Sequence, residues 1–179
     1  MQKIKLWLMY QWYLGFTRFA NRVLRFYYKF KGCKFDQMDL IHSGFQMSDD
    51  YVYAALITRY LISNCEYDDS ARVDLIKDPE HFLFDRKGNC NDFSSAILSF
   101  LMRYKPYHEA HLMIVYAPEW RGHAVCCVQK NNKWFHCSNW GVQPDLHETL
   151  DQLASSIKSD WNYYVLVDEK LNLRRIVTR

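Results

Sequence analysis

A glycine followed at once by a strongly patterned helical segment lies at the centre of the chain, in the run Lys87-Gly88-Asn89-Cys90-Asn91-Asp92-Phe93. Beyond it, apolar residues recur at steps of three and four, which predicts an amphipathic helix packed by one face on the core. The apolar face consists of Phe93, Ala96, Ile97, Phe100, Leu101 and Tyr104. Cys90 lies one step before Phe93 on the same face, so its side chain is expected to point toward whatever the helix covers.

The position of Cys90 at a helix N-terminus has two interpretations. The N–H groups and the dipole at that end favour negative charge, and can lower a cysteine pKa from about 8.5 to roughly 3.5–7.5. That chemistry predicts a nucleophilic thiolate. Free cysteine is also among the most buried residue types and often only fills space. The helix position by itself leaves both interpretations open.

A predicted β-hairpin follows, with a strand over residues 120–128, a polar turn over 130–133 and a strand over 134–141 that ends in a glycine. His123 opens the first strand and Asn139 closes the second. Antiparallel pairing brings these two ends together, so a base would lie beside a group that orients it. A cysteine, a histidine and an asparagine or aspartate from separate elements form the set that thiol acyl-transfer chemistry needs.

With these residues, the chain resembles the transglutaminase-like branch of the papain-like cysteine enzymes, of the bacterial or phage type. The Cys90 segment is similar to the family's glycine, acidic or amide residue, catalytic cysteine and helix. Gly122-His123-Ala124-Val125 is similar to its glycine-histidine-small-apolar strand, and the stretch from Lys133 to Asn139 resembles its tryptophan and acid-bearing strand. The resemblance covers roughly residues 75–141. It implies Cys90 as nucleophile, His123 as base and Asn139 as the orienting group.

One position departs from the family pattern. Where the family has an aspartate four residues after the strand tryptophan, this chain has Ser138, followed by Asn139. Strand alternation places these two on opposite faces, so only one can face His123. Asn139 is the expected partner, because an amide carbonyl is the better acceptor for a ring N–H. Asparagine adds no negative charge, so the Cys–His ion pair is expected to be weaker; an orienting Ser138 or a degraded site are the alternatives.

The expected chemistry is attack by the Cys90 thiolate on an amide carbonyl, with His123 moving the proton and the Cys90 N–H as first oxyanion donor. Hydrolysis of the acyl-enzyme would make the protein a peptidase, amidase or deamidase acting on a protein or peptide amide; transfer to an amine would make it a transamidase. Trp120 and Trp140 either line the cleft or, as we favour, pack at the sheet end. The rival function is a non-catalytic binding protein that keeps the fold and holds an anionic partner or surface through its basic N-terminal region.

The hairpin also gathers residues that can bind zinc, namely His123, Cys126, Cys127, His136 and Cys137. The hairpin has no Cys-x-x-Cys motif, and strand alternation points Cys126 away from His123 and Cys127, so four ligands do not converge. No metal or other cofactor is therefore expected. The cysteines other than Cys90 are interpreted as ordinary buried or partly buried thiols. These are Cys33, Cys65, Cys126, Cys127 and Cys137.

Charge is distributed unevenly along the chain. Residues 1–35 carry eight basic residues, no acidic residue and many aromatics. The apolar stretch from Ile4 to Phe16 contains Gln11 and Gly15 and is too short and mixed for a membrane-spanning helix. Beyond it, basic residues recur at helical steps from Arg18. Three interpretations stay open: a helix packed on the core with a solvated basic face, which we favour, an arm for a membrane surface or anionic partner, and a nucleic-acid contact.

The chain has 179 residues, 49% of them hydrophobic, enough for one substantial core. We expect a helical extension over residues 1–35 and a transglutaminase-like domain over 36–179. The adjacent Cys126-Cys127 pair is a poor disulfide framework and no cleavable signal is recognisable, so a cytoplasmic location is expected. The predicted class is α+β, with helices packed on an antiparallel sheet. Further helices are predicted over 51–63, 79–84 and 146–158, and strands over 111–116, 163–167 and 173–177.

Overall fold

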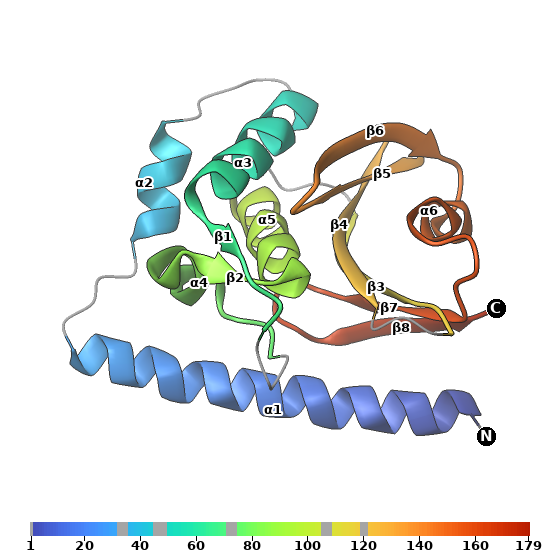
Figure 1. The fold of residues 1–179 in the computed structure, drawn as a ribbon, viewed down its shortest axis with the longest axis horizontal. Helices are drawn as coiled ribbons and strands as arrows, with labels where there is room; N and C mark the ends of the chain where they lie inside the picture. The colour runs from blue at the N-terminus through green and yellow to red at the C-terminus, as the bar shows by residue number, and fades with distance from the viewer. Residues whose placement is uncertain (1, 32–35, 45–49, 71–74, 105–108, 119–121) are drawn as a thin grey trace.

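The computed structural model describes residues 2–31, 36–44, 50–70, 75–104, 109–118 and 122–179 (Figure 1). Within these ranges the helices are α1 Gln2–Phe30, α2 Gln37–Ser43, α3 Asp50–Asn64, α4 Pro79–Asp85, α5 Cys90–Tyr104 and α6 Leu150–Ile157. The strands are β1 Glu66–Tyr67, β2 Lys87–Gly88, β3 Ala110–Tyr116, β4 His123–Lys130, β5 Lys133–Ser138, β6 Gly141–His147, β7 Tyr163–Val167 and β8 Leu173–Thr178.

A six-stranded antiparallel sheet forms the centre of the fold, in the order β6-β5-β4-β3-β7-β8. The central strand β4 pairs on one side with β3, where Leu112 lies opposite Cys126, and on the other with β5, where Cys137 lies opposite Cys126. The sheet is strongly curved, with α5 on one side and α6 on the other (Figure 1). The short strands β1 and β2 pair separately in parallel.

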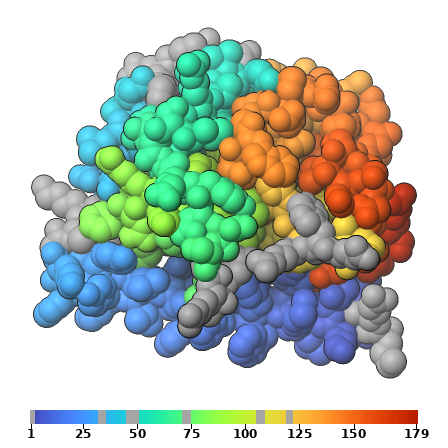
Figure 2. Space-filling view, viewed as in Figure 1, coloured from blue at the N-terminus to red at the C-terminus, as the bar shows by residue number. Residues whose placement is uncertain are grey.

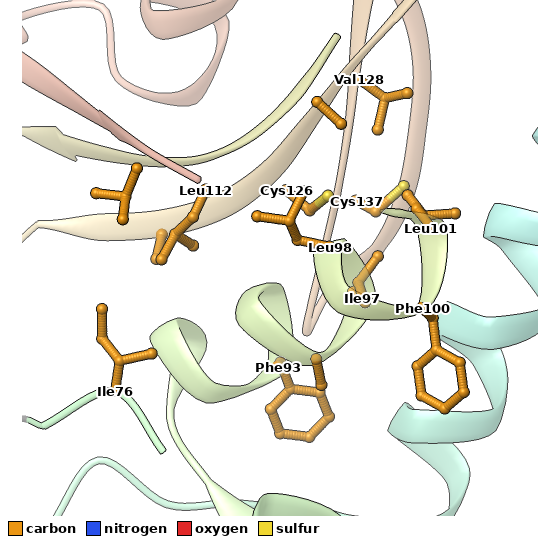
Figure 3. Packing of buried hydrophobic residues seen from close by; sticks show 14 of the residues in the cluster. Ile76, Phe93, Ile97, Leu98, Phe100, Leu101, Leu112, Cys126, Val128 and Cys137 are labelled. Carbon is orange, nitrogen blue, oxygen red and sulfur yellow. The ribbon is translucent and has the colours of Figure 1, made fainter. Parts of the chain in front are cut away.

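Both faces of the sheet are covered around β4. Side chains alternate along this strand, and successive residues belong to two apolar clusters on opposite faces of the sheet. Ala124, Cys126 and Val128 belong to the larger cluster under α5, where Leu98, Leu101 and Phe93 of the helix are also buried (Figure 3). Val125 and Cys127 belong to the cluster on the opposite face, which includes Leu153 of α6. A strand covered on both faces reads as a continuous apolar run, as residues 124–128 do.

The long helix α1 lies along one side of the molecule (Figure 1). At about 1.5 Å per residue its 29 residues span roughly 43 Å. Tyr10, Leu14 and Thr17 are its buried residues and face the core. Asn21 adds a polar tie, because its Nδ2 donates to the Ile76 carbonyl at 2.8 Å. The helix is therefore docked on the domain along much of its length.

The structure confirms the α+β class, the central helix and the predicted strands of β3, β7 and β8. The predicted helix over 146–158 was wrong at its start: residues 141–147 form β6, and α6 begins only at Leu150. This edge strand is half-exposed, so its sequence shows no alternation of apolar and polar residues. It also contains Pro144, which cannot donate a hydrogen bond to a neighbouring strand and argues against a strand in the sequence. The strands β1 and β2 and the helix α2 were not predicted. Trp120, assigned to the first hairpin strand, lies outside the described residues.

Candidate active site

Cys90 is the first residue of α5, and the helix end that carries it is reciprocally capped. The Asn89 side-chain oxygen accepts from the N–H groups of Asn91 at 3.0 Å and Asp92 at 3.4 Å. In return, Asp92 Oδ2 accepts from the Asn89 N–H at 3.0 Å. This is the arrangement of a capping box, with asparagine at the cap and aspartate three residues later. It fixes the start of the helix, and with it the backbone of Cys90.

Asp92 also holds the chain that leads into the helix. It is buried, and its Oδ1 accepts from the Lys77 N–H at 2.7 Å. Gly88 packs so closely on this side chain that an added Cβ would lie 2.5 Å from Asp92 Oδ2 and 2.9 Å from the Phe82 ring. The glycine of the Gly-Asn-Cys run is thus required by space. It brings the incoming strand directly against the helix end.

His123 is the first residue of β4 and is only 3% exposed. The helix and this strand are tied where the Ser94 hydroxyl donates to the Ala124 carbonyl at 2.9 Å. Cys90 lies one turn before Ser94 on α5, and His123 lies one residue before Ala124. The structure thus brings the ends that carry Cys90 and His123 to the same region. Side chains alternate along β4, so His123 lies on the same face of the sheet as Val125. Cys90 instead packs against the larger apolar cluster, which lies on the other face under α5. The two side chains can therefore meet only around the start of β4.

Trp140 covers the imidazole of His123. The two rings stack with their centroids 3.9 Å apart and their planes 11° apart, while Trp140 itself is 64% exposed. Burial, with a smaller contribution from the neighbouring His136, lowers the pKa of His123 to about 4. The imidazole is therefore neutral at pH 7. It is suited to accept a proton as a general base, and does not form a resting imidazolium.

The residues proposed to orient His123 lie at the end of β5. Ser138 is fully buried, and its hydroxyl accepts from the Trp140 N–H at 3.1 Å. Asn139 is the first residue of the turn between Ser138 and Gly141, which pair across it. Its side-chain oxygen is buried and has no hydrogen-bond partner among the described residues. A buried acceptor without a donor costs about 1–3 kcal/mol, so an N–H group that reached this oxygen would be stabilising.

Two buried histidines give the fold a defined pH dependence. Burial lowers the pKa of both His123 and His136 to about 4, from an ordinary value of 6.5. Between pH 6.5 and 4 the unfolded chain binds protons that the folded chain does not, so stability is lost as the pH falls through this window. We expect the free energy of unfolding to drop by about 2–3 kcal/mol per histidine from pH 7 to pH 4. Urea titrations across this range should show a flatter profile for the His136→Asn variant; an unchanged profile would contradict the assignment.

The other described thiols are poor nucleophiles. Cys126, Cys127 and Cys137 are buried in the sheet, and burial raises the pKa of the latter two to about 12. Burial also raises the pKa of the half-buried Cys65. In the part of the chain that the structure describes, no group of three or more His, Cys, Asp or Glu residues is placed to hold a metal ion. Cys33 lies outside the described residues.

A small cavity of about 150 Å³ adjoins Trp140 and is lined in part by His136, Gln143 and His147. Larger cavities of about 390 and 340 Å³ lie elsewhere, at Arg25, Asp78 and Pro79. Their lining includes residues of α1, α4 and α5 but neither Cys90 nor His123. The two larger cavities therefore do not coincide with the candidate site. The small cavity adjoins it, because Trp140 stacks on His123.

Comparison with known proteins gives the class of the chain. The family model described as the transglutaminase-like superfamily matches residues 43–138, more than half of the chain. The chain therefore belongs to the transglutaminase-like superfamily. The match includes Cys90 and His123 and ends at Ser138, one residue before Asn139. No curated protein matches the chain significantly.

Solved structures with a similar fold include LapG of Legionella pneumophila, in EGTA-treated and calcium-bound forms. Both are 16% identical with a TM-score of 0.49; the match covers 70% of this chain and 68% and 70% of the two LapG chains. A protein of Cytophaga hutchinsonii named as a candidate cysteine protease is also 16% identical, with a TM-score of 0.46. The match covers 82% of this chain and 51% of that protein, so this chain spans about half its length.

Sequence reasoning missed two features of the site. For Trp140 it favoured packing at the sheet end over a position lining the cleft, whereas the Trp140 side chain is largely exposed and its ring covers His123. It also gave Asp92 no role, although this residue closes the cap and holds Lys77. The Asn-x-x-Asp spacing around Cys90 was the available signal for this cap.

Within the described residues, no helix has both the length and the apolar content needed to cross a bilayer.

Proposed function

We propose that this protein is a cysteine hydrolase that cleaves amide bonds through an acyl-enzyme on Cys90. The observation that carries the proposal is the placement of Cys90 at a capped helix N-terminus that the Ser94–Ala124 hydrogen bond ties to the strand beginning with His123. Membership of the transglutaminase-like superfamily supports the same chemistry. A cytoplasmic location belongs to the proposal, since a reactive thiol and several buried thiols suit reducing surroundings.

In the proposed mechanism, neutral His123 removes the Cys90 proton as the sulfur attacks the carbonyl carbon. Charge on the carbonyl oxygen is stabilised by the Cys90 N–H and the N-terminal end of α5. The protonated imidazole then donates its proton to the leaving amine, which departs and leaves a thioester on Cys90. Water attacks the thioester with His123 again as base and releases the acid; an amine in place of water would give transamidation.

Trp140 and Asn139 are proposed to support His123. The stacked indole excludes water from one side of the imidazole, which keeps it neutral and so able to accept a proton. Asn139 would accept the second ring N–H through its buried oxygen and hold the reactive nitrogen toward Cys90. Because asparagine carries no charge, it stabilises the imidazolium less than an aspartate would.

The proposed function predicts a stoichiometric burst with p-nitrophenyl acetate, an activated ester that acylates nucleophilic thiols. One equivalent of nitrophenolate per chain should be released rapidly, followed by slower turnover. Cys90→Ala should abolish the burst, and mass spectrometry should locate the acetyl group on Cys90 in the unaltered chain. The matched control is Cys65→Ala, which removes a thiol whose pKa burial raises and should leave the burst intact.

Two results would contradict the proposal. A burst that survives in Cys90→Ala would assign the acylation to another group. A folded, unaltered chain that shows no burst would favour the rival function, a binding protein that keeps the fold without the chemistry.

A further inference from the structure

Helix α1 carries an apolar stripe that points away from the protein. We define the outer stripe as Trp12, Phe16, Phe19, Val23, Phe26 and Phe30. These residues follow one another at steps of four and three, so they share one side of the helix. All are exposed, with Trp12 73%, Phe26 75% and Phe30 85% accessible. The buried Tyr10, Leu14 and Thr17 lie on the opposite side, against the core.

The outer stripe is more than scattered surface residues. It covers about five helical turns, and α1 forms the lower side of the molecule (Figure 2). Contiguous exposed apolar surface of this kind marks an interaction site on a protein that is otherwise well packed. Two of its aromatic rings, Trp12 and Phe16, stack on each other with centroids 5.7 Å apart and planes at 4°. The stripe is therefore an ordered surface on a docked helix.

The charge of α1 selects among possible occupants of this face. The helix contains six basic residues and no acidic one. Arg22 and Lys29 are exposed and lie seven residues apart, or about two helical turns, so both border the outer stripe on the same side. Lys3 and Lys5 are exposed near the N-terminus of α1. A second copy of α1 would add six more cations beside these, which is unfavourable. Nucleic acid would satisfy the cations but leave the aromatic stripe in water.

An anionic lipid bilayer meets both features at once. Trp and Phe side chains are favourable at the boundary between headgroups and acyl chains, and each nearby Lys or Arg adds about 1 kcal/mol of attraction to an anionic leaflet. We propose that α1 lies in the plane of an anionic membrane surface, with the outer stripe in the interface and Arg22 and Lys29 at the headgroups. This inference stands on α1 alone and does not depend on the proposed function of Cys90.

Because α1 is docked on the catalytic fold, membrane binding would fix how the domain faces the bilayer. Tyr10 packs on Tyr116 with ring centroids 6.2 Å apart, and the Tyr116 ring would lie 2.9 Å from a Cβ added to Gly122, the residue before His123. The membrane-facing helix is thus linked, through the Tyr116 ring, to the segment that carries the candidate base. The domain would be held at the surface as a rigid unit.

The test is flotation of the full chain with lipid vesicles. We expect binding to vesicles of phosphatidylcholine mixed with phosphatidylserine, little binding to phosphatidylcholine alone, and weakening as salt is raised. The W12S/F19S/F26S variant should bind roughly tenfold or more weakly, and R22E/K29E should lose the preference for the anionic vesicles. Matched controls elsewhere on the surface are L40S/L146S, two exposed apolar residues, and R59E, an exposed cation on α3; all should bind normally.

Three outcomes would overturn the proposal. The first is an absence of binding to the anionic vesicles, and the second is equal binding by W12S/F19S/F26S. The third is a stable dimer in sedimentation that the same substitutions dissolve, because this result would assign the face to a second copy. Circular dichroism should show native helix content in every variant, since the altered side chains are exposed.

Discussion

Replacing His123 with alanine is expected to slow acylation of Cys90 by p-nitrophenyl acetate by roughly a hundredfold or more at pH 7. A positioned general base contributes about 10²–10⁴ to such a step, and the neutral imidazole of His123 is available for that role. The substitution also leaves a void beneath Trp140, so the effect on folding must be separated from the effect on chemistry. The measurement is the burst rate, followed together with the free energy of unfolding.

The matched control is His81→Ala. His81 is also buried and neutral at pH 7, because burial lowers its pKa, but it lies on α4 beside Tyr28 of α1. This variant should lose comparable stability and keep its burst rate within a few-fold. Asn139→Ala should slow the burst by about tenfold, as expected for an orienting group. A His123→Ala protein that acylates as fast as His81→Ala would remove His123 from the mechanism.

Replacing Asp92 with alanine is expected to lower the free energy of unfolding by about 3 kcal/mol. The substitution removes the buried acceptor for the N–H groups of Lys77 and Asn89 and leaves both groups without this partner in a partly buried region. A lost cap costs about 1 kcal/mol, and each buried donor without an acceptor adds about 1–3 kcal/mol, which partial access of water reduces. Urea unfolding of the two proteins measures the difference.

Asp92→Asn keeps one carbonyl oxygen and should lose less, about half as much. The control is Asp160→Ala, which removes an exposed carboxylate whose ion pair with Lys158, at 3.8 Å, should contribute at most about 1 kcal/mol. Because the cap fixes the first turn of α5, Asp92→Ala should also reduce the reactivity of Cys90. An Asp92→Ala protein as stable as Asp160→Ala would show that the cap does not hold this helix end.

The parts of the fold that were predicted correctly are those whose sequence pattern is set by burial. Helix α5 shows its apolar face at steps of three and four, and β4 shows the continuous apolar run of a strand covered on both faces. The strand β6 lacks both signals. It lies at the sheet edge with mostly partial exposure, and its pairing with β5 depends on the tight turn at Asn139 and Trp140. Pairing across a turn is a tertiary property that local periodicity does not contain.

The candidate site shows a similar division. The placement of Cys90 followed from a glycine and a helical pattern, and His123 from the start of a strand. The stack of Trp140 on His123 depends on where a two-residue turn directs an indole, and the amphipathic pattern of α1 does not say which of its two apolar sides faces the core. Phe19, Val23, Phe26 and Phe30 form a visible stripe in the sequence beside the basic residues of α1, and the structure shows that this stripe points outward.

The most direct test of Cys90 as an activated thiol is the rate at which iodoacetamide alkylates each cysteine of the native chain, determined by peptide mapping between pH 5 and 8. Cys65 is the internal reference, because it is also half-buried and its pKa is raised. We predict that Cys90 is labelled at least tenfold faster than Cys65 at the acidic end of this range, while Cys126, Cys127 and Cys137 react only after unfolding. Labelling of Cys90 no faster than that of Cys65 at every pH would contradict the assignment of Cys90 as the nucleophile.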